Sequence, residues 1–207
     1  MQPSEVPYPA DAEQQPLADD CRRCAELPSS RTCLSWGNGP TDASVVVVGE
    51  APAAGDPDAE RWRGGNLTGM AYTSRASGRK VRALVADAGY AGDAYYTNAV
   101  KCHPPGNRDP TGDERANCRP WLREELDLVA PDAVVPTGKH ATESVFALAG
   151  RELSGFLDVV LDPIGTRFGR VVPVLHPSYE EVWRSRLGYD REGYVAALAD
   201  ALDRDSR

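Results

Sequence analysis

Four consecutive valines, Val45–Val48, are the feature that most limits what this chain can fold into. A short, continuous, β-branched run that ends at Gly49 is typical of a central parallel strand buried on both faces. Three more runs predict strands, at residues 94–100, 132–136 and 171–175. Helical patterns lie between them, so the sequence predicts an α/β fold: a three-layer α/β/α sandwich around a central, mostly parallel four-stranded sheet.

The helices expected between these strands carry start and stop signals. Apolar residues recur at helical spacing from Val81 to the stop at Gly89. Thr111, with Glu114 three residues later, forms a capping box that predicts the start of the next helix. The same signals predict a hairpin at Gly165 and Gly169, and helices at residues 140–149 and 189–203.

The chain has 207 residues, enough for one buried core. Residues 1–19 are polar and rich in proline without periodicity, so we expect a flexible arm at 1–19 and one domain at 20–207. No apolar run approaches the roughly 20 residues that span a bilayer, so we expect no membrane association. The N-terminal residues lack the basic start and apolar stretch of a signal peptide, which predicts a cytoplasmic protein. We also expect a monomer.

Polar residues follow three of the predicted strands at the points where they end. Glu50 follows the valine run, Asn98 lies at the end of the second strand, and His176 follows the fourth. Ligands of α/β proteins bind beyond the carboxyl ends of the strands. The sequence therefore predicts that these three side chains surround one crevice.

Five cysteines in a cytoplasmic chain are unlikely to form a disulfide framework, because that compartment keeps thiols reduced. Cys21 and Cys24 form a CxxC pair, while Cys102 and Cys118 flank the loop before the capped helix. We predict that these four thiolates hold a metal centre, and their spacing fits zinc and an iron-sulfur cluster equally. The alternative is that Cys102 and Cys118 are small buried residues. Cys33 is expected to be structural.

Four segments together resemble the uracil-DNA glycosylase superfamily, and most closely its iron-sulfur-containing branches of the family 4 and 5 type. They are Gly49-Glu50-Ala51-Pro52, Tyr96–Cys102, Pro104–Arg108 and His176-Pro177-Ser178. The resemblance covers residues 20 to 202. It implies a base-excision repair hydrolase that cleaves the N-glycosidic bond of uracil in DNA, and it favours a 4Fe-4S cluster over zinc at the four cysteines.

The resemblance also suggests roles for individual residues. Asn98 matches the base-reading asparagine, whose amide pairs with both N3 and O4 of a flipped uracil. Tyr72 lies where similar proteins carry an aromatic residue, and we expect it to stack on the base. His176 is expected to donate to O2 of the leaving uracil, and Glu50 to orient water and stabilise the sugar cation. The backbone amides of Gly49–Ala51 are expected to bind the base.

Two departures from the family pattern concern the loop after the first strand. Ala53 stands where a glycine usually follows, and the polar stretch 56–63 lengthens the loop, with Asp56 as an alternative catalytic carboxylate. The segment 65–73 is closer to a neighbouring branch that accepts more kinds of damaged base. The net charge of −8 means that DNA binding must rely on local basic patches. The candidates are Arg61, Arg63, Arg75, Arg79, Lys80, Arg82, Arg184 and Arg186, and Tyr179 is a candidate for filling the vacated stack.

Two other functions compete with the glycosylase. One is a uracil-DNA binding or crosslinking protein of the same fold, in which a histidine replaces water as the nucleophile. That class is expected to carry a basic insertion with an extra histidine before the last strand, which this sequence lacks. The other is a non-catalytic iron-sulfur or zinc module, which would leave the polar residues at the strand ends without a joint purpose.

Overall fold

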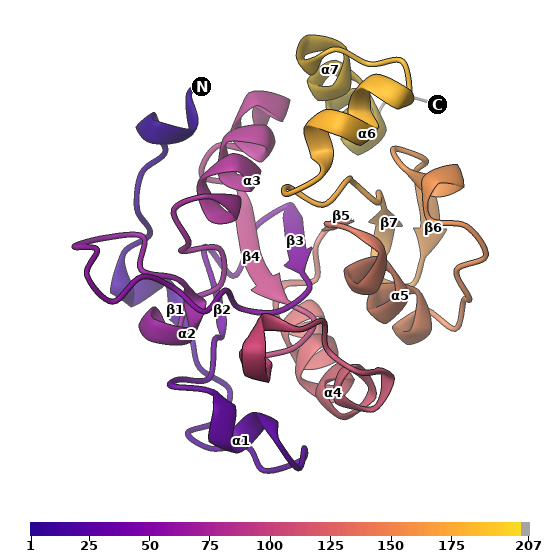
Figure 1. The fold of residues 1–207 in the computed structure, drawn as a ribbon. Helices are drawn as coiled ribbons and strands as arrows, with labels where there is room; N and C mark the ends of the chain where they lie inside the picture. The colour runs from indigo at the N-terminus through magenta and orange to yellow at the C-terminus, as the bar shows by residue number, and fades with distance from the viewer. Residues whose placement is uncertain (204–207) are drawn as a thin grey trace.

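A central mixed sheet organises the chain in the computed structural model, which describes residues 1–203 (Figure 1). The strand order is β1-β2-β4-β3-β5-β7-β6, and the four inner strands β4, β3, β5 and β7 run parallel. The predicted α/β class and parallel sheet are confirmed. The predicted count of four strands describes only this parallel part, because β1, β2 and β6 add short antiparallel edges.

The elements have the following bounds. The strands are β1 Gln14–Gln15, β2 Gly37–Asn38, β3 Val45–Gly49, β4 Ala94–Asn98, β5 Ala133–Pro136, β6 Ile164–Thr166 and β7 Gly169–Val171. The helices are α1 Leu27–Ser30, α2 Gly65–Thr68, α3 Ser77–Val85, α4 Gly112–Val129, α5 Lys139–Leu148, α6 Glu180–Arg186 and α7 Arg191–Leu202.

Helices cover both faces of the sheet, which completes the predicted three layers. Val45 and Val47 of β3 face a core that includes α3 and α7, whereas Val46 and Val48 face a core that includes α4 and α5. All four valines are at most 1% exposed, as the continuous β-branched run predicts. In Figure 1, α6 and α7 lie at one end of the molecule near α3, and α1 lies at the other end beside α4.

The fourth predicted strand differs from expectation. β7 ends at Val171, and Pro173 has no N–H with which to continue a ladder. Val174 then returns to the sheet through an isolated parallel bridge with Thr137. This bridge directs the chain into His176 at the carboxyl end of the sheet.

Residues 1–19, the predicted flexible arm, lie against the domain. Val6 is 8% exposed, Tyr8 packs edge-on against Trp62 with ring centroids 5.2 Å apart, and β1 pairs with β2. The division into an arm and a domain stays a prediction. Among the described residues, no helix is both long and apolar enough to cross a membrane.

Candidate active site

A cavity of about 660 Å³ lies at the carboxyl ends of the parallel strands. Its wall includes the segments that follow β3, β4 and β5, and the chain from Leu175 to Tyr179. All six residues predicted to act on the substrate line this one cavity: Gly49, Glu50, Ala51, Tyr72, Asn98 and His176. The convergence expected from the strand ends is therefore present.

Asn98, the last residue of β4, is 3% exposed, and its side-chain Nδ2 has no hydrogen-bond partner. A Cβ atom on Gly49 would lie 2.3 Å from the Asn98 Oδ1 atom, so only glycine leaves room for this amide. A buried amide nitrogen without a partner is costly unless a ligand completes it. The cavity therefore presents an amide that is ready to pair with a polar group.

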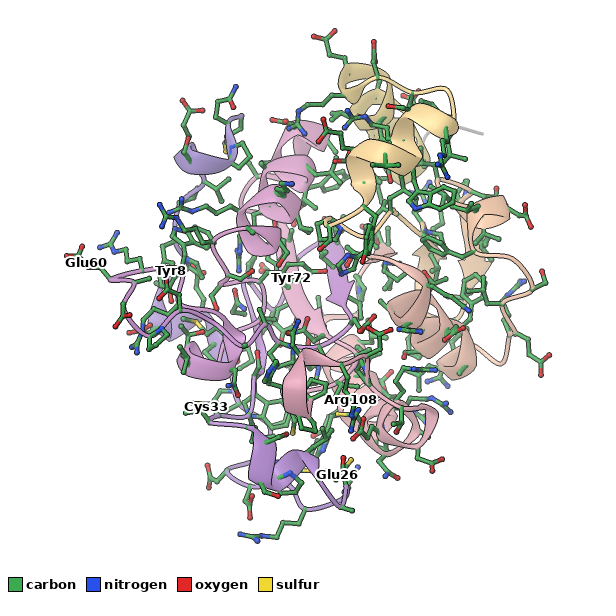
Figure 2. All side chains as sticks on the ribbon, viewed as in Figure 1. Tyr8, Glu26, Cys33, Glu60, Tyr72 and Arg108 are labelled. Atoms are coloured by element: carbon green, nitrogen blue, oxygen red, sulfur yellow. The ribbon has the colours of Figure 1, made fainter. Side chains whose placement is uncertain are left out.

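Tyr72 is held at the centre of the molecule (Figure 2). Its hydroxyl lies 2.7 Å from Thr137 Oγ1, and its ring packs edge-on against Tyr96. Its backbone has a φ of 54°, a left-handed conformation that non-glycine residues seldom adopt. Burial raises the pKa of the Tyr72 hydroxyl, so the group stays neutral. The ring is thereby held in one orientation on the cavity wall.

His176 has a defined tautomer when it is neutral. The backbone N–H of Ser178 donates to His176 Nδ1 at 3.2 Å, so the ring proton resides on Nε2. Burial lowers the pKa of His176, which favours this neutral form. His176 is thus prepared to donate one hydrogen bond through Nε2.

Glu50 is paired with a histidine that sequence reasoning did not place at the site. His140 Nδ1 lies 2.9 Å from Glu50 Oε2, and this hydrogen bond raises the pKa of His140. Asp109 also lies close, and one donor atom from each of these three residues falls within 4.8 Å of the others. His140 lies in the first turn of α5, directly after β5. The strand-end argument applied to β5 would have found it.

The four predicted cysteine ligands line a second, small cavity between the α1 region and α4, and Cys33 is not part of it. Each sulfur accepts a hydrogen bond from a different donor: Arg31 Nη1 to Cys102 at 3.2 Å, Lys101 N to Cys118 at 3.2 Å, Trp121 Nε1 to Cys21 at 3.5 Å and Asn117 Nδ2 to Cys24 at 3.7 Å. Such N–H donors are suited to thiolates that carry charge.

The spacing of the four sulfurs bears on which group they fit. A tetrahedral zinc with bonds of about 2.3 Å would bring its sulfurs to about 3.8 Å from one another. Among residues 1–203, no three of the cysteine sulfurs lie within 4.8 Å of one another. A cubane offers one iron to each thiolate and holds them farther apart. The residues present fit a four-iron cluster.

A family model for the uracil-DNA glycosylase superfamily matches residues 36–202, which is most of the chain. The protein belongs to the uracil-DNA glycosylase superfamily. It is 34% identical to a type-5 uracil-DNA glycosylase of Pyrobaculum aerophilum, over 89% of this chain and 87% of that protein. It is 31% identical to a type-4 uracil-DNA glycosylase of Thermotoga maritima, over 83% and 85% of the two chains, and 29% identical to a type-5 protein of Mycobacterium tuberculosis, over 84% and 75%.

These relatives confirm the predicted branch of the uracil-DNA glycosylase superfamily, with both types 4 and 5 among the matches. Two residue assignments are wrong. Asp56, the alternative carboxylate, is exposed and does not line the cavity. Arg82, a candidate for DNA contact, is 8% exposed, donates to Asn38 and the carbonyl of Tyr72, and lies over the ring of Tyr96. Arg82 therefore stabilises the backbone at Tyr72 through this hydrogen bond.

Proposed function

We propose that this protein is a monofunctional glycosylase that hydrolyses the N-glycosidic bond of uracil in DNA during base excision repair. The observation that carries the proposal is the unpartnered, buried Asn98 amide in a cavity that also contains Tyr72, His176 and Glu50. Relatives named uracil-DNA glycosylases, aligned over most of their length, support the same activity.

Recognition takes place on a nucleotide that has left the DNA stack, at a cost of a few kcal/mol. Asn98 donates through Nδ2 to O4 of uracil and accepts the N3 proton at Oδ1. Tyr72 stacks on the extruded base, and stacking of this kind contributes about 1–3 kcal/mol. The backbone amides between Gly49 and Ala51 bind the base from the side of β3.

Cleavage places negative charge on the departing uracil and positive charge on the sugar. The Nε2–H of neutral His176 donates to O2 and stabilises the anion. The carboxylate of Glu50 stabilises the sugar cation and orients the attacking water. One cavity must therefore offer a hydrogen-bond donor to the uracil anion and a negative charge to the sugar cation. Neutral His176, whose pKa is lowered by burial, provides the donor, and the carboxylate of Glu50 provides the charge.

Cys21, Cys24, Cys102 and Cys118 are proposed to hold a 4Fe-4S cluster. When bound, the cluster acts as a structural crosslink that ties the segment before α1 to α4 and to the loop that follows Asn98. None of the five cysteines forms a disulfide, and a reducing, cytoplasmic location is part of the proposal. A monomer that binds uracil-containing DNA completes the proposal.

A uracil-containing oligonucleotide, incubated with the protein and then treated with alkali, tests the activity. We expect strand scission at uracil only, and a rate loss of about 10²-fold or more in Asn98→Ala, because a buried donor to a developing anion is lost. Metal analysis of the same preparation, purified without oxygen, is expected to show iron.

Asn66→Ala is the matched control, because Asn66 is also a buried asparagine but bonds the backbone of Thr32 and does not line the cavity. It should retain excision at a temperature where it is folded. A complex with DNA that survives denaturant would indicate the crosslinking function instead. Absence of both scission and complex would contradict the proposal, and zinc without iron would contradict the cluster.

A further inference from the structure

The hydrogen-bonded pair of Glu50 and His140 joins a loop to a helix. Glu50 lies in the loop that leaves β3, whereas His140 lies on α5, where its carbonyl accepts from Ser144 Oγ at 2.9 Å. The two side chains are 22% and 24% exposed, so neither is sealed from the cavity. Within residues 1–203, His140 is the only side chain that forms a hydrogen bond with the Glu50 carboxylate, at 2.9 Å.

One oxygen of the Glu50 carboxylate is therefore hydrogen-bonded to His140, and the other is free to face the substrate. The bond from His140 Nδ1 engages Oε2 of Glu50, and Oε1 has no such contact among the described residues. A carboxylate in a loop has many rotamers, and a hydrogen bond to a helix selects one of them. The helix thus determines where the free oxygen lies relative to the sugar.

We propose that His140 is a positioning residue for Glu50, which aims the carboxylate at the sugar and makes its effective charge depend on pH. The inference rests on the proposed role of Glu50 in uracil excision. His140 does not contact the reacting atoms, since it acts through Glu50.

The charged groups around His140 determine the direction of the pH effect. Its hydrogen bond to Glu50 raises the pKa of His140, burial and Arg115 lower it, and Glu143 raises it. Asp109 faces the pair from the loop before α4, Lys139 and Arg115 are themselves paired with Glu143, and His176 lies across the cavity. Because its pKa is raised, His140 is more than half protonated at pH 6.5, which is about the ordinary pKa of histidine.

Protonated His140 neutralises Glu50 and weakens its field at the sugar cation. Above the pKa of His140, the Nδ1–H still donates to Oε2, but the carboxylate acts with its full charge. The rate of cleavage is therefore expected to rise with pH through the pKa of His140. His176 is expected to titrate at lower pH than His140, because burial lowers the pKa of His176 whereas the hydrogen bond to Glu50 raises that of His140.

Single-turnover rates of uracil release between pH 5.5 and 9 test the proposal. His140→Ala is expected to lose about 10-fold to 100-fold in rate at pH 8, with unchanged affinity for DNA, because misplacement of a catalytic group lowers the chemical step. His140→Asn keeps a donor near the position of Nδ1 but cannot titrate. It should retain a rate within a few-fold of the wild type and lose the rise with pH.

His103→Asn is the matched control, because His103 also lines the cavity but bonds the carbonyl of Pro52 at 3.0 Å and no carboxylate. Whatever its rate, this variant should keep the rise with pH. The double variant Glu50→Gln with His140→Ala should be no slower than Glu50→Gln alone, because the two residues act as one unit.

A readout that does not depend on turnover separates this inference from the proposed function. The NMR pKa of His140 in the free protein should lie above its ordinary value and fall in Glu50→Gln. An unshifted pKa, or a rise with pH that persists in His140→Asn, would overturn the positioning role while leaving uracil excision intact. A wild-type protein that shows the shifted pKa but releases no uracil would instead overturn the proposed function, and with it the role of His140 in catalysis.

Discussion

Gly138 links the backbone of one strand end to the side chain of His176. It precedes α5 with a φ of 88° and a ψ of 173°, a combination that is almost confined to glycine. A Cβ at this position would lie 3.0 Å from the Cβ of His176 and 3.3 Å from its ring. The absence of a side chain at Gly138 therefore decides where the imidazole sits.

Gly138→Ala should reduce uracil release by about 10-fold to 100-fold, because a displaced His176 no longer reaches O2. It should also lower the free energy of unfolding by about 1–3 kcal/mol through backbone strain. Gly150→Ala is the control, since Gly150 lies just past the other end of α5 with a φ of 70° and open space around it. Both variants are measured by thermal unfolding and by excision rate. Equal rates in the two variants would contradict the role given to Gly138.

At this scale, sequence reasoning found the residues that directly follow long strands. Glu50 and Asn98 were predictable because the buried runs before them are unambiguous, and His176 because of its His-Pro-Ser context. His140 was missed because the strand-end argument was not applied to β5, and Asp109 because its approach to Glu50 depends on how the loop before α4 folds over the sheet. Arg82 was misassigned because nothing in a basic segment shows which side chain turns inward.

At the scale of elements, a buried ion pair joins the segment that follows β4 to α4. Lys101 and Glu125 are 1% and 0% exposed, and Lys101 Nζ also donates to the carbonyl of Asn98 at 2.6 Å. Glu125 accepts further hydrogen bonds from Thr97 Oγ1 at 2.6 Å and from Gly37 N at 2.9 Å. The backbone N–H of the same lysine donates to Cys118. This pair therefore lies between Asn98 and the cysteine site.

Glu125→Leu should lower the free energy of unfolding by about 3–5 kcal/mol, because it leaves the Lys101 ammonium buried without a counterion. Lys101→Met combined with Glu125→Leu should recover part of this loss, since no charge then remains buried. Asp127→Ala on the same helix is the control: its pair with Arg123 is more than half exposed, and its loss should cost under about 1 kcal/mol. Urea unfolding provides the values, and equal effects of Glu125→Leu and Asp127→Ala would refute the argument.

The long elements were predictable from sequence, whereas the short ones were not. β3 and β5 follow from valine runs, β4 from the Tyr95-Tyr96-Thr97 run, and α4 begins where the Thr111 capping box predicts it. β1 and β2 have two residues each, which is too short for any periodicity. β2 pairs with the free edge of β4, and β1 pairs in turn with β2. α6 is only seven residues long.

At the scale of the whole molecule, the first residues run along the outside of the fold toward the cysteine site. Val6 and Trp62 form a small core with Ala83, and Gln14 Nε2 donates to the carbonyl of Gly69 at 2.7 Å. Proline-rich, polar composition predicted flexibility here. The few apolar side chains, Val6 and Tyr8, instead find partners on the loop that carries Trp62. The average composition of the segment does not show that Val6 is buried and that Tyr8 is partly buried against this cluster.

Deletion of residues 1–13 tests whether this segment is part of the folded unit. We expect the free energy of unfolding to fall by about 2 kcal/mol, the contribution of burying one medium apolar side chain and an aromatic contact. Tryptophan emission should also shift toward longer wavelength as Trp62 becomes exposed. Deletion of residues 1–4 keeps Val6 and Tyr8 and should change neither quantity. Identical stability of the two truncated proteins would support the prediction of a flexible arm.

Before any DNA arrives, the protein already holds the Asn98 Nδ2 group away from other hydrogen-bond acceptors. A buried polar group in this condition costs about 1–3 kcal/mol. In the proposed role of Asn98, O4 of uracil faces Nδ2 and removes that cost, whereas cytosine presents an amino group there and places two donors opposite each other. Discrimination against cytosine would then follow from a donor that the protein leaves unpaired before DNA binds.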